Sequence, residues 1–123
     1  MGSEVLYIGK REKMASILLK KEMRKGELWC LLGAQVVRGR LTITRIDFQE
    51  WEYNQRSGQV EVSYYFDEAN TDRMMELIEE HNPVKFLRKL KAKFRKRCGI
   101  SMTWEIREYC KEHGITYEYF VWY

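Results

Sequence analysis

The chain has 123 residues, of which 45% are hydrophobic and 33% are charged, and its formal net charge is +4. This length favours one domain with a single modest core, and the composition excludes intrinsic disorder, collagen-like repeats and low-complexity sequence. No stretch approaches the roughly 20 apolar residues of a transmembrane helix, and the first ten residues lack the apolar region of a signal peptide. Three cysteines in a chain able to fold without disulfides indicate reduced thiols. We therefore expect a cytoplasmic protein.

The first half of the chain predicts strands with one helix among them. Residues 10–25 carry Met14, Ile17 and Leu18 at helical spacing, with Gly26 as the stop. Around Arg38-Gly39 the sequence predicts a hairpin or one long bent strand, and Ser57-Gly58 is expected to form the next turn. Apolar or alternating runs that predict strands recur at six places, namely residues 4–8, 28–32, 35–37, 41–46, 48–54 and 60–66.

The second half predicts three helices and then a last strand. Each helix has a candidate N-capping residue, and these are Asn70 or Thr71, Asn82 followed by Pro83, and Ser101. The second helix is expected to end at Cys98-Gly99, and Gly114 suits the position after the third. Each helix also has an apolar stripe, formed in turn by Met74, Met75, Leu77 and Ile78; by Phe86, Leu87, Leu90 and Phe94; and by Met102, Ile106, Tyr109, Cys110 and His113.

Residues 115–123 carry five aromatic side chains on both faces of a predicted strand. This pattern suits a central strand covered on both sides, or an edge strand that pairs with another chain. Together the elements predict a single α+β domain over residues 1–123. We expect a mainly antiparallel sheet of about five to six strands with helices packed on it, in which three consecutive C-terminal helices precede the final aromatic strand.

Positive charge is concentrated in the predicted second helix. Eight cations lie within residues 85–97, which hold no acid: Lys85, Arg88, Lys89, Lys91, Lys93, Arg95, Lys96 and Arg97. A surface of this kind attracts phosphate, because neutralised phosphates release condensed counterions. The preceding segment, residues 67–80, carries six acids and one Arg. The sequence leaves open whether the basic helix faces solvent or pairs with this acidic segment.

Aromatic residues are the second unusual feature. Trp51, Tyr53 and Tyr65 belong to the predicted hairpin that also contains Tyr64 and Phe66. On an exposed sheet face such rings stack on unpaired bases, whereas in a core they only pack. The basic helix and these hairpin aromatics together predict a small, non-enzymatic protein that binds nucleic acid or another phosphate-bearing ligand.

Two other functions remain as alternatives. The aromatic final strand is typical of a protein-interaction or inhibitor module. One version of this hypothesis is a homodimer that forms through this strand. The carboxylates Asp47, Glu50, Glu52 and Glu61 on adjacent predicted strands are the basis of a third hypothesis, a metal-dependent nuclease.

No catalytic residue, metal site or cofactor is predicted. Cys98, Cys110 and His113 do not have the paired spacing of a zinc site, and they lie on or beside an apolar helix stripe. We therefore expect them to pack in the core.

Overall fold

The computed structural model describes residues 6–8, 14–51, 56–94 and 99–122. Within these residues six strands form one antiparallel sheet in the sequence order β1-β2-β3-β4-β5-β6. The strands are β1 (Leu6–Ile8), β2 (Met14–Arg24), β3 (Glu27–Val37), β4 (Arg40–Trp51), β5 (Arg56–Tyr65) and β6 (Glu118–Trp122). Between β5 and β6 the chain forms α1 (Glu68–Ile78), α2 (Pro83–Phe94) and α3 (Gly99–Glu112). The protein is thus a single small α+β domain with a final C-terminal strand, as the sequence predicts.

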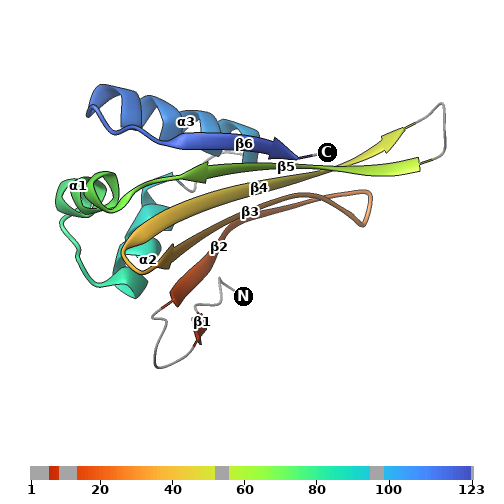
Figure 1. Ribbon diagram of the computed structural model, residues 1–123. Coiled ribbons are helices and arrows are strands. Elements are labelled where there is room, and N and C mark those ends of the chain that lie inside the picture. Colours follow the sequence, from red (N-terminus) through yellow and green to blue (C-terminus); the bar gives the residue numbers. More distant parts are fainter. Residues whose placement is uncertain (1–5, 9–13, 52–55, 95–98, 123) are drawn as a thin grey trace.

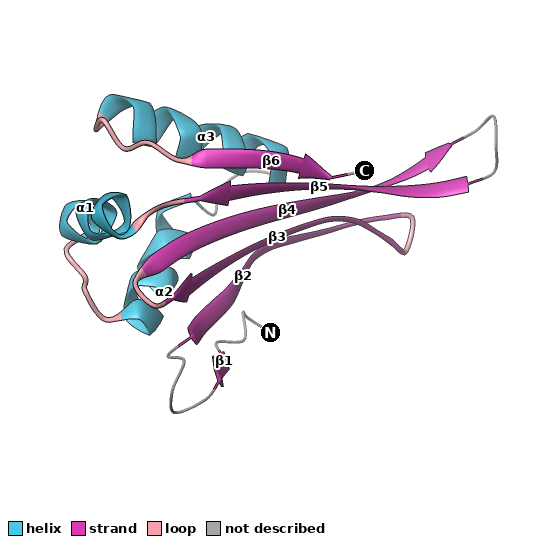
Figure 2. Ribbon diagram, viewed as in Figure 1, coloured by secondary structure: helices cyan, strands magenta, loops and turns pink. Residues whose placement is uncertain are grey.

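The three helices cover one face of the sheet and leave the other open (Figures 1 and 2). Alternate strand residues face the helices and are buried, including Ala15, Ile17, Leu32 and Ile43, and the inner helix stripes complete this core. Phe86, Leu87 and Leu90 of α2 are fully buried, as their spacing predicts. In Figure 1 the ends of β4 and β5 run beyond the helical layer. Among the described residues, no helix is long and apolar enough to cross a membrane.

The prediction of a helix over residues 10–25 is wrong. Residues 14–24 form β2, which pairs with β3, and residues 10–13 lie outside the described part of the chain. The pairing register shifts between Leu18 and Lys20, yet Ala15, Ile17 and Leu19 are buried in strict alternation on the helix-covered face. Met14 and Leu18 lie on the other face of β2 from Ile17, so apolar residues from both faces together give a spacing that resembles a helix. Tertiary pairing therefore outweighs the local preference of Met, Leu, Lys and Glu for a helix.

Three strands are longer than the sequence predicts, and one predicted turn is wrong. Residues 28–32 and 35–37 belong to one strand, β3, while 41–46 and 48–51 belong to β4. Ser57 and Gly58 lie in β5 opposite Glu50 and Gln49 instead of in a turn. The hairpin at Arg38-Gly39 is confirmed, and Lys25-Gly26 forms a second turn of the same kind. The φ angles are 52° and 76° at the first turn and 52° and 79° at the second, which match the type I′ geometry that joins twisted strands.

Two predicted helix caps are wrong, and one is confirmed. Asp67 caps α1, accepting from the backbone N–H of Asn70 at 2.8 Å, while Thr71 is buried and its Oγ1 accepts from the backbone N–H of Leu41. The helix α3 begins at Gly99, two residues before Ser101. Asn82 does cap α2, since its Oδ1 accepts from the N–H of Lys85 at 3.1 Å. The described part of α2 ends at Phe94, and residues 95–98 lie outside the description.

Candidate functional site

The basic helix α2 packs on β2 and β3, and most of its described cations are exposed. Lys85, Arg88, Lys89 and Lys93 are exposed, and Lys91 is half-buried. The other three predicted ligand-binding cations, Arg95, Lys96 and Arg97, lie outside the described residues. Within the described part of α2 there is no acidic side chain, so this helix presents positive charge to solvent.

Some of this charge is engaged within the molecule. Lys89 Nζ lies 3.5 Å from Glu80 Oε1 and donates to the carbonyl oxygen of Glu79. The backbone N–H of Asn82, and after it Lys89, hold the pKa of Glu80 below its ordinary value. Lys93 Nζ lies 4.9 Å from the centroid of the Tyr109 ring, a cation–π contact. The acidic and basic segments therefore meet at Lys89, while Lys85 and Arg88 are exposed on the outer side of the helix.

The structure separates Tyr65 from the basic helix. Tyr64 is buried on the helix-covered side, whereas Tyr65 is 41% exposed on the open face, because neighbouring strand residues point to opposite sides. The ring of Tyr65 packs edge-on against Phe120 with centroids 5.6 Å apart. Trp51 belongs to β4, and Tyr53 lies outside the described residues. The basic helix and Tyr65 consequently do not share one surface.

The carboxylates considered for a nuclease are also separated. Asp47 pairs with Arg45 at 3.1 Å, and its register partners are Cys30 and Val60 on the helix-covered side. Glu61 lies opposite Ile46 in the next register position, so its side chain emerges on the open face. The side chain of Glu50 and residue Glu52 fall outside the description. Asp47 and Glu61 therefore cannot share a metal ion.

The described thiols lie in the interior. Cys110 is fully buried, and burial raises its pKa to about 12. Burial, together with the neighbouring Asp47, raises the pKa of Cys30 to about 12. The ring of His113 lies 4.5 Å from that of Tyr109, centroid to centroid, and Cys98 lies outside the described residues. Cys110 and His113 thus pack with core and aromatic groups.

The strand β6 forms an exposed edge of the sheet. It pairs with β5 from Glu61↔Trp122 to Tyr65↔Glu118, and no strand of the described chain lies on its other side. All five of its residues are exposed. The exposed fractions are 59% for Tyr119, 48% for Phe120, 39% for Val121 and 59% for Trp122. Of the two placements that the sequence allows, the central strand is wrong and the edge position is observed, while pairing with another chain stays a prediction.

A groove of about 650 Å³ lies between α3 and the segment leading into β6. Trp104, which is 61% exposed, and Tyr119 both line it. On the same wall Arg107 Nε donates to the hydroxyl of Tyr117 at 3.2 Å. Sequence reasoning missed Trp104, although it stands midway between Met102 and Ile106 of the predicted buried stripe and therefore on the opposite side of α3, from which its exposure could have been inferred.

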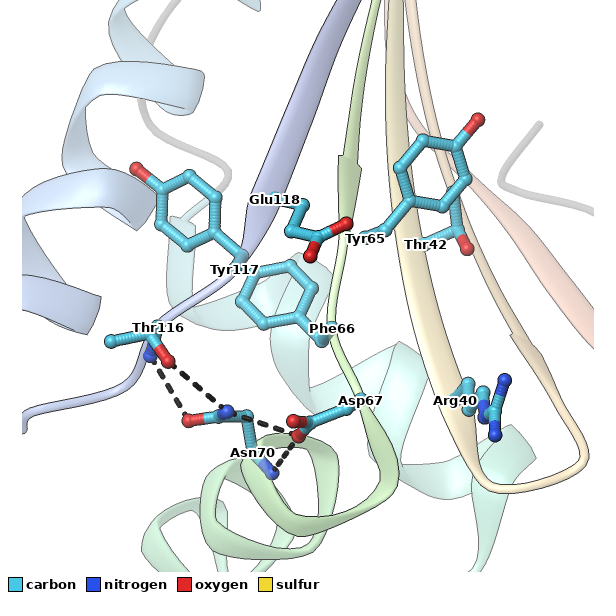
Figure 3. A pocket seen from close by; sticks show the side chains of 9 residues that line it. All are labelled: Arg40, Thr42, Tyr65, Phe66, Asp67, Asn70, Thr116, Tyr117 and Glu118. Carbon is cyan, nitrogen blue, oxygen red and sulfur yellow. Dashed lines mark hydrogen bonds between the residues drawn. The ribbon is translucent and has the colours of Figure 1, made fainter.

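Asn70 fastens the start of β6 to the rest of the domain (Figure 3). Its Oδ1 accepts from the backbone N–H of Thr116 at 3.0 Å, and its Nδ2 donates to Thr116 Oγ1 at 3.2 Å and to Asp67 Oδ1 at 3.0 Å. These bonds border a second cavity of about 380 Å³ that is also lined by Arg40, Thr42 and Tyr65. The exposed strand is therefore anchored at its first end by side-chain hydrogen bonds.

Comparison with known proteins finds no match. No protein-family model, no curated protein and no solved structure matches this chain. The function has to be argued from the arrangement of the side chains.

Proposed function

We propose that this protein is a protein-interaction module that binds an extended, strand-forming segment of another polypeptide along the free edge of β6. One observation carries the proposal. The four consecutive residues Tyr119 to Trp122 are large, apolar or aromatic, and exposed at the edge of the sheet. An edge strand also offers a row of outward N–H and C=O groups, which an added strand can pair.

The composition of β6 supports this reading. Soluble proteins protect their sheet edges with Lys, Pro, bulges or very short strands, and residues 118–122 contain neither Lys, Arg nor Pro. Their register with β5 runs without a shift. Aromatic side chains are enriched in protein interfaces, where they contribute much of the binding energy. The edge thus combines free backbone groups, which provide affinity, with alternating side chains, which provide specificity.

Amide hydrogen exchange measured by NMR tests strand addition directly. The probes are an eight-residue peptide that alternates Val and Thr between terminal lysines, and a peptide with the chain's own residues 116–123. The matched control peptide has Pro at alternate positions and so lacks backbone donors. We expect either strand peptide to slow exchange at outward-facing amides of residues 118–122, and the Pro peptide to have no effect. In a chain that does not self-associate, unchanged exchange of β6 with both strand peptides would rule out the proposed function.

The exposed cations of α2 favour a second candidate, contact with the phosphate backbone of nucleic acid. Lys85 and Arg88 are exposed on a helix whose described residues include no acid. Affinity for mixed-sequence DNA or RNA should then fall steeply with salt, with a slope of about −0.7 to −0.9 per phosphate contacted. The double change of Lys85→Glu and Arg88→Glu should abolish binding, while Lys21→Glu with Lys25→Glu, equal in charge and located on and beside β2, should weaken it far less. Absence of binding by the unmodified chain at low salt would eliminate this candidate.

A further inference from the structure

We infer that the strand added to β6 is β6 of a second copy of this chain, which makes the protein a two-fold symmetric dimer. This inference rests on the proposed function and names the partner for the same edge. In antiparallel pairing a two-fold axis perpendicular to the sheet relates the two strands, and directly opposed residues point to the same face. The helices of both copies then lie on one side of a continuous sheet.

One register pairs all five residues of both strands and centres on Phe120. Phe120 then lies opposite the partner's Phe120 on the open face, and Tyr119 lies opposite the partner's Val121 on the helix-covered face. Aromatic and β-branched side chains in such cross-strand positions stabilise a sheet. Because each strand supplies both members of every pair, the edge is complementary to itself.

The charges near β6 are compatible with self-association. Glu118 is the one ionised side chain in the strand. In the register centred on Phe120 the two copies of Glu118 stand at opposite ends of the pair, about 13 Å apart for four residues of strand, which exceeds the Debye length of about 8 Å at physiological salt. The cations of α2 lie over β2 and β3, away from this edge. The net charge of +4 on each chain is therefore not concentrated where the copies meet.

The side chains that flank β6 enlarge the contact. Five paired residues alone bury less than the roughly 1,200 Å² of a stable interface. Trp104 and Tyr119 extend the apolar surface into the groove on the helix side, and Tyr65 extends it beside Phe120 on the open face. A contact of this modest size is typical of weak association, so the dimer should form and dissociate with concentration.

The opposite edge of the sheet favours a closed dimer over a filament. Along β2 the register is irregular, and Lys20 and Lys21 lie at its second half, so this edge is a poor acceptor for β6 of another copy. Pairing of β6 with β6 is isologous and uses both exposed edges at once, whereas pairing of β6 with β2 would continue without limit. We therefore expect two copies and no larger assembly.

Sedimentation velocity of the full chain from about 1 to about 500 µM tests the inference. The mass should rise from 14.9 kDa towards twice that value. Phe120→Lys places two ammonium groups on the symmetry axis and should weaken the dimer at least tenfold. Met23→Lys, which changes an apolar side chain of nearly equal exposure at the far end of β2, is the control and should leave association unchanged.

A cysteine pair provides a second test that does not depend on charge. Opposed residues of antiparallel strands have Cα atoms about 4.5 to 5.5 Å apart, within the range of a disulfide. Phe120→Cys should therefore give a covalent dimer under mild oxidation, and Met23→Cys should not.

The outcomes separate the two proposals. A chain that stays monomeric at all concentrations while the Val-Thr peptide protects β6 would overturn self-pairing and leave strand addition standing. A dimer that tolerates Phe120→Lys as well as Met23→Lys, with no cross-link at position 120, would use another surface and would overturn this inference. No protection of β6 by either strand peptide, in a chain that does not associate, would remove both.

Discussion

The two edges of the sheet differ in ways that matter for association. At one edge β1 spans only three residues and pairs with the first three of β2, and beyond them β2 carries Lys20 and Lys21 and two register shifts. At the other edge β6 is regular, uncharged except for Glu118, and exposed along its whole length. The first edge has the devices that prevent strands from adding to a sheet, and the second has none. The proposed pairing at β6 is based on this difference between the two edges.

Truncating a buried side chain near one edge and an exposed side chain at the other should give the largest difference in the free energy of unfolding. Leu19 sits in the irregular part of β2 but is 2% exposed, whereas Trp122 in β6 is 59% exposed. Leu19→Ala should lower the free energy of unfolding by about 2 to 5 kcal/mol, because it leaves a cavity under the helices. Trp122→Ala should lower it by less than about 1 kcal/mol. Urea denaturation at about 1 µM protein, where the chain is expected to be monomeric, measures both. Equal losses would mean that Trp122 belongs to the core of the isolated chain.

The turn that joins β2 to β3 should show a smaller effect that comes from the backbone alone. Gly26 has φ of +79°, and a Cβ added there meets nothing within 4 Å. Gly26→Ala should therefore cost about 1 kcal/mol of unfolding free energy through the left-handed conformation only. The control is Gly33→Ala within β3, where the nearest atom would be 3.7 Å away and the effect should stay within about 0.5 kcal/mol. Thermal melts of the two variants provide the comparison, and the reverse order would contradict it.

Loss of the Asn70 anchor should lower the free energy of unfolding by a similar amount, but it should also change amide exchange specifically in β6. Asn70→Ala removes the two hydrogen bonds to Thr116 and should cost about 1 kcal/mol. Amide exchange of residues 118–122 should become faster, because this end of the strand is released. Asn82→Ala is the matched control: it removes the cap of α2 and should cost about as much without changing β6. If both variants affect β6 alike, the loosening is global and the anchor has no separate role.

The smallest effect concerns pH and comes from Asp67, which is hydrogen-bonded to the anchor residue Asn70. The hydrogen bond from the backbone N–H of Asn70, followed by that from its side chain, holds the pKa of Asp67 below its ordinary value. A carboxyl with a lowered folded-state pKa stabilises the fold above its unfolded pKa, and this stabilisation is lost as the pH falls through the folded value. We expect the free energy of unfolding to decline below about pH 4, and the decline to be shallower in Asp67→Asn. Urea titrations between about pH 5 and 2.5 test this, and identical slopes for the two proteins would contradict it.

Short-range signals in the sequence proved sufficient for several elements. The alternation of Val62, Tyr64 and Phe66 with polar neighbours predicts β5 and its buried face, as observed. Asn82 and Pro83 predict the start of α2, and Arg38-Gly39 predicts a tight hairpin. Each of these depends on interactions within a few residues, which a single sequence contains in full. The bulge in β2 and the cap at Asp67 were missed because a neighbouring strand and the path of the chain into α1 decide them.

The sequence predicts the separate components of the candidate site but not how they are arranged in space. The sequence identifies the cations of α2, the exposed or buried alternatives for Tyr65, and the aromatic content of residues 115–123. It does not indicate that α2 and Tyr65 occupy opposite faces, because this depends on which face of the sheet the helices cover. The exposure of Trp104 beside Tyr119 likewise arises from the packing of α3 next to the segment that leads into β6.

By itself the sequence determined an α+β domain, three consecutive C-terminal helices with their buried stripes, a basic second helix and a strongly aromatic last strand, because periodicity and composition are local properties of the chain. Tertiary structure decided that residues 14–24 pair as a strand and that Asp47 and Glu61 point apart. It also decided that the last strand lies at an edge instead of the centre. In a β-sheet the neighbours of a strand come from distant parts of the chain, so its burial is fixed by the order of the strands and by the helical layer, which no local pattern records.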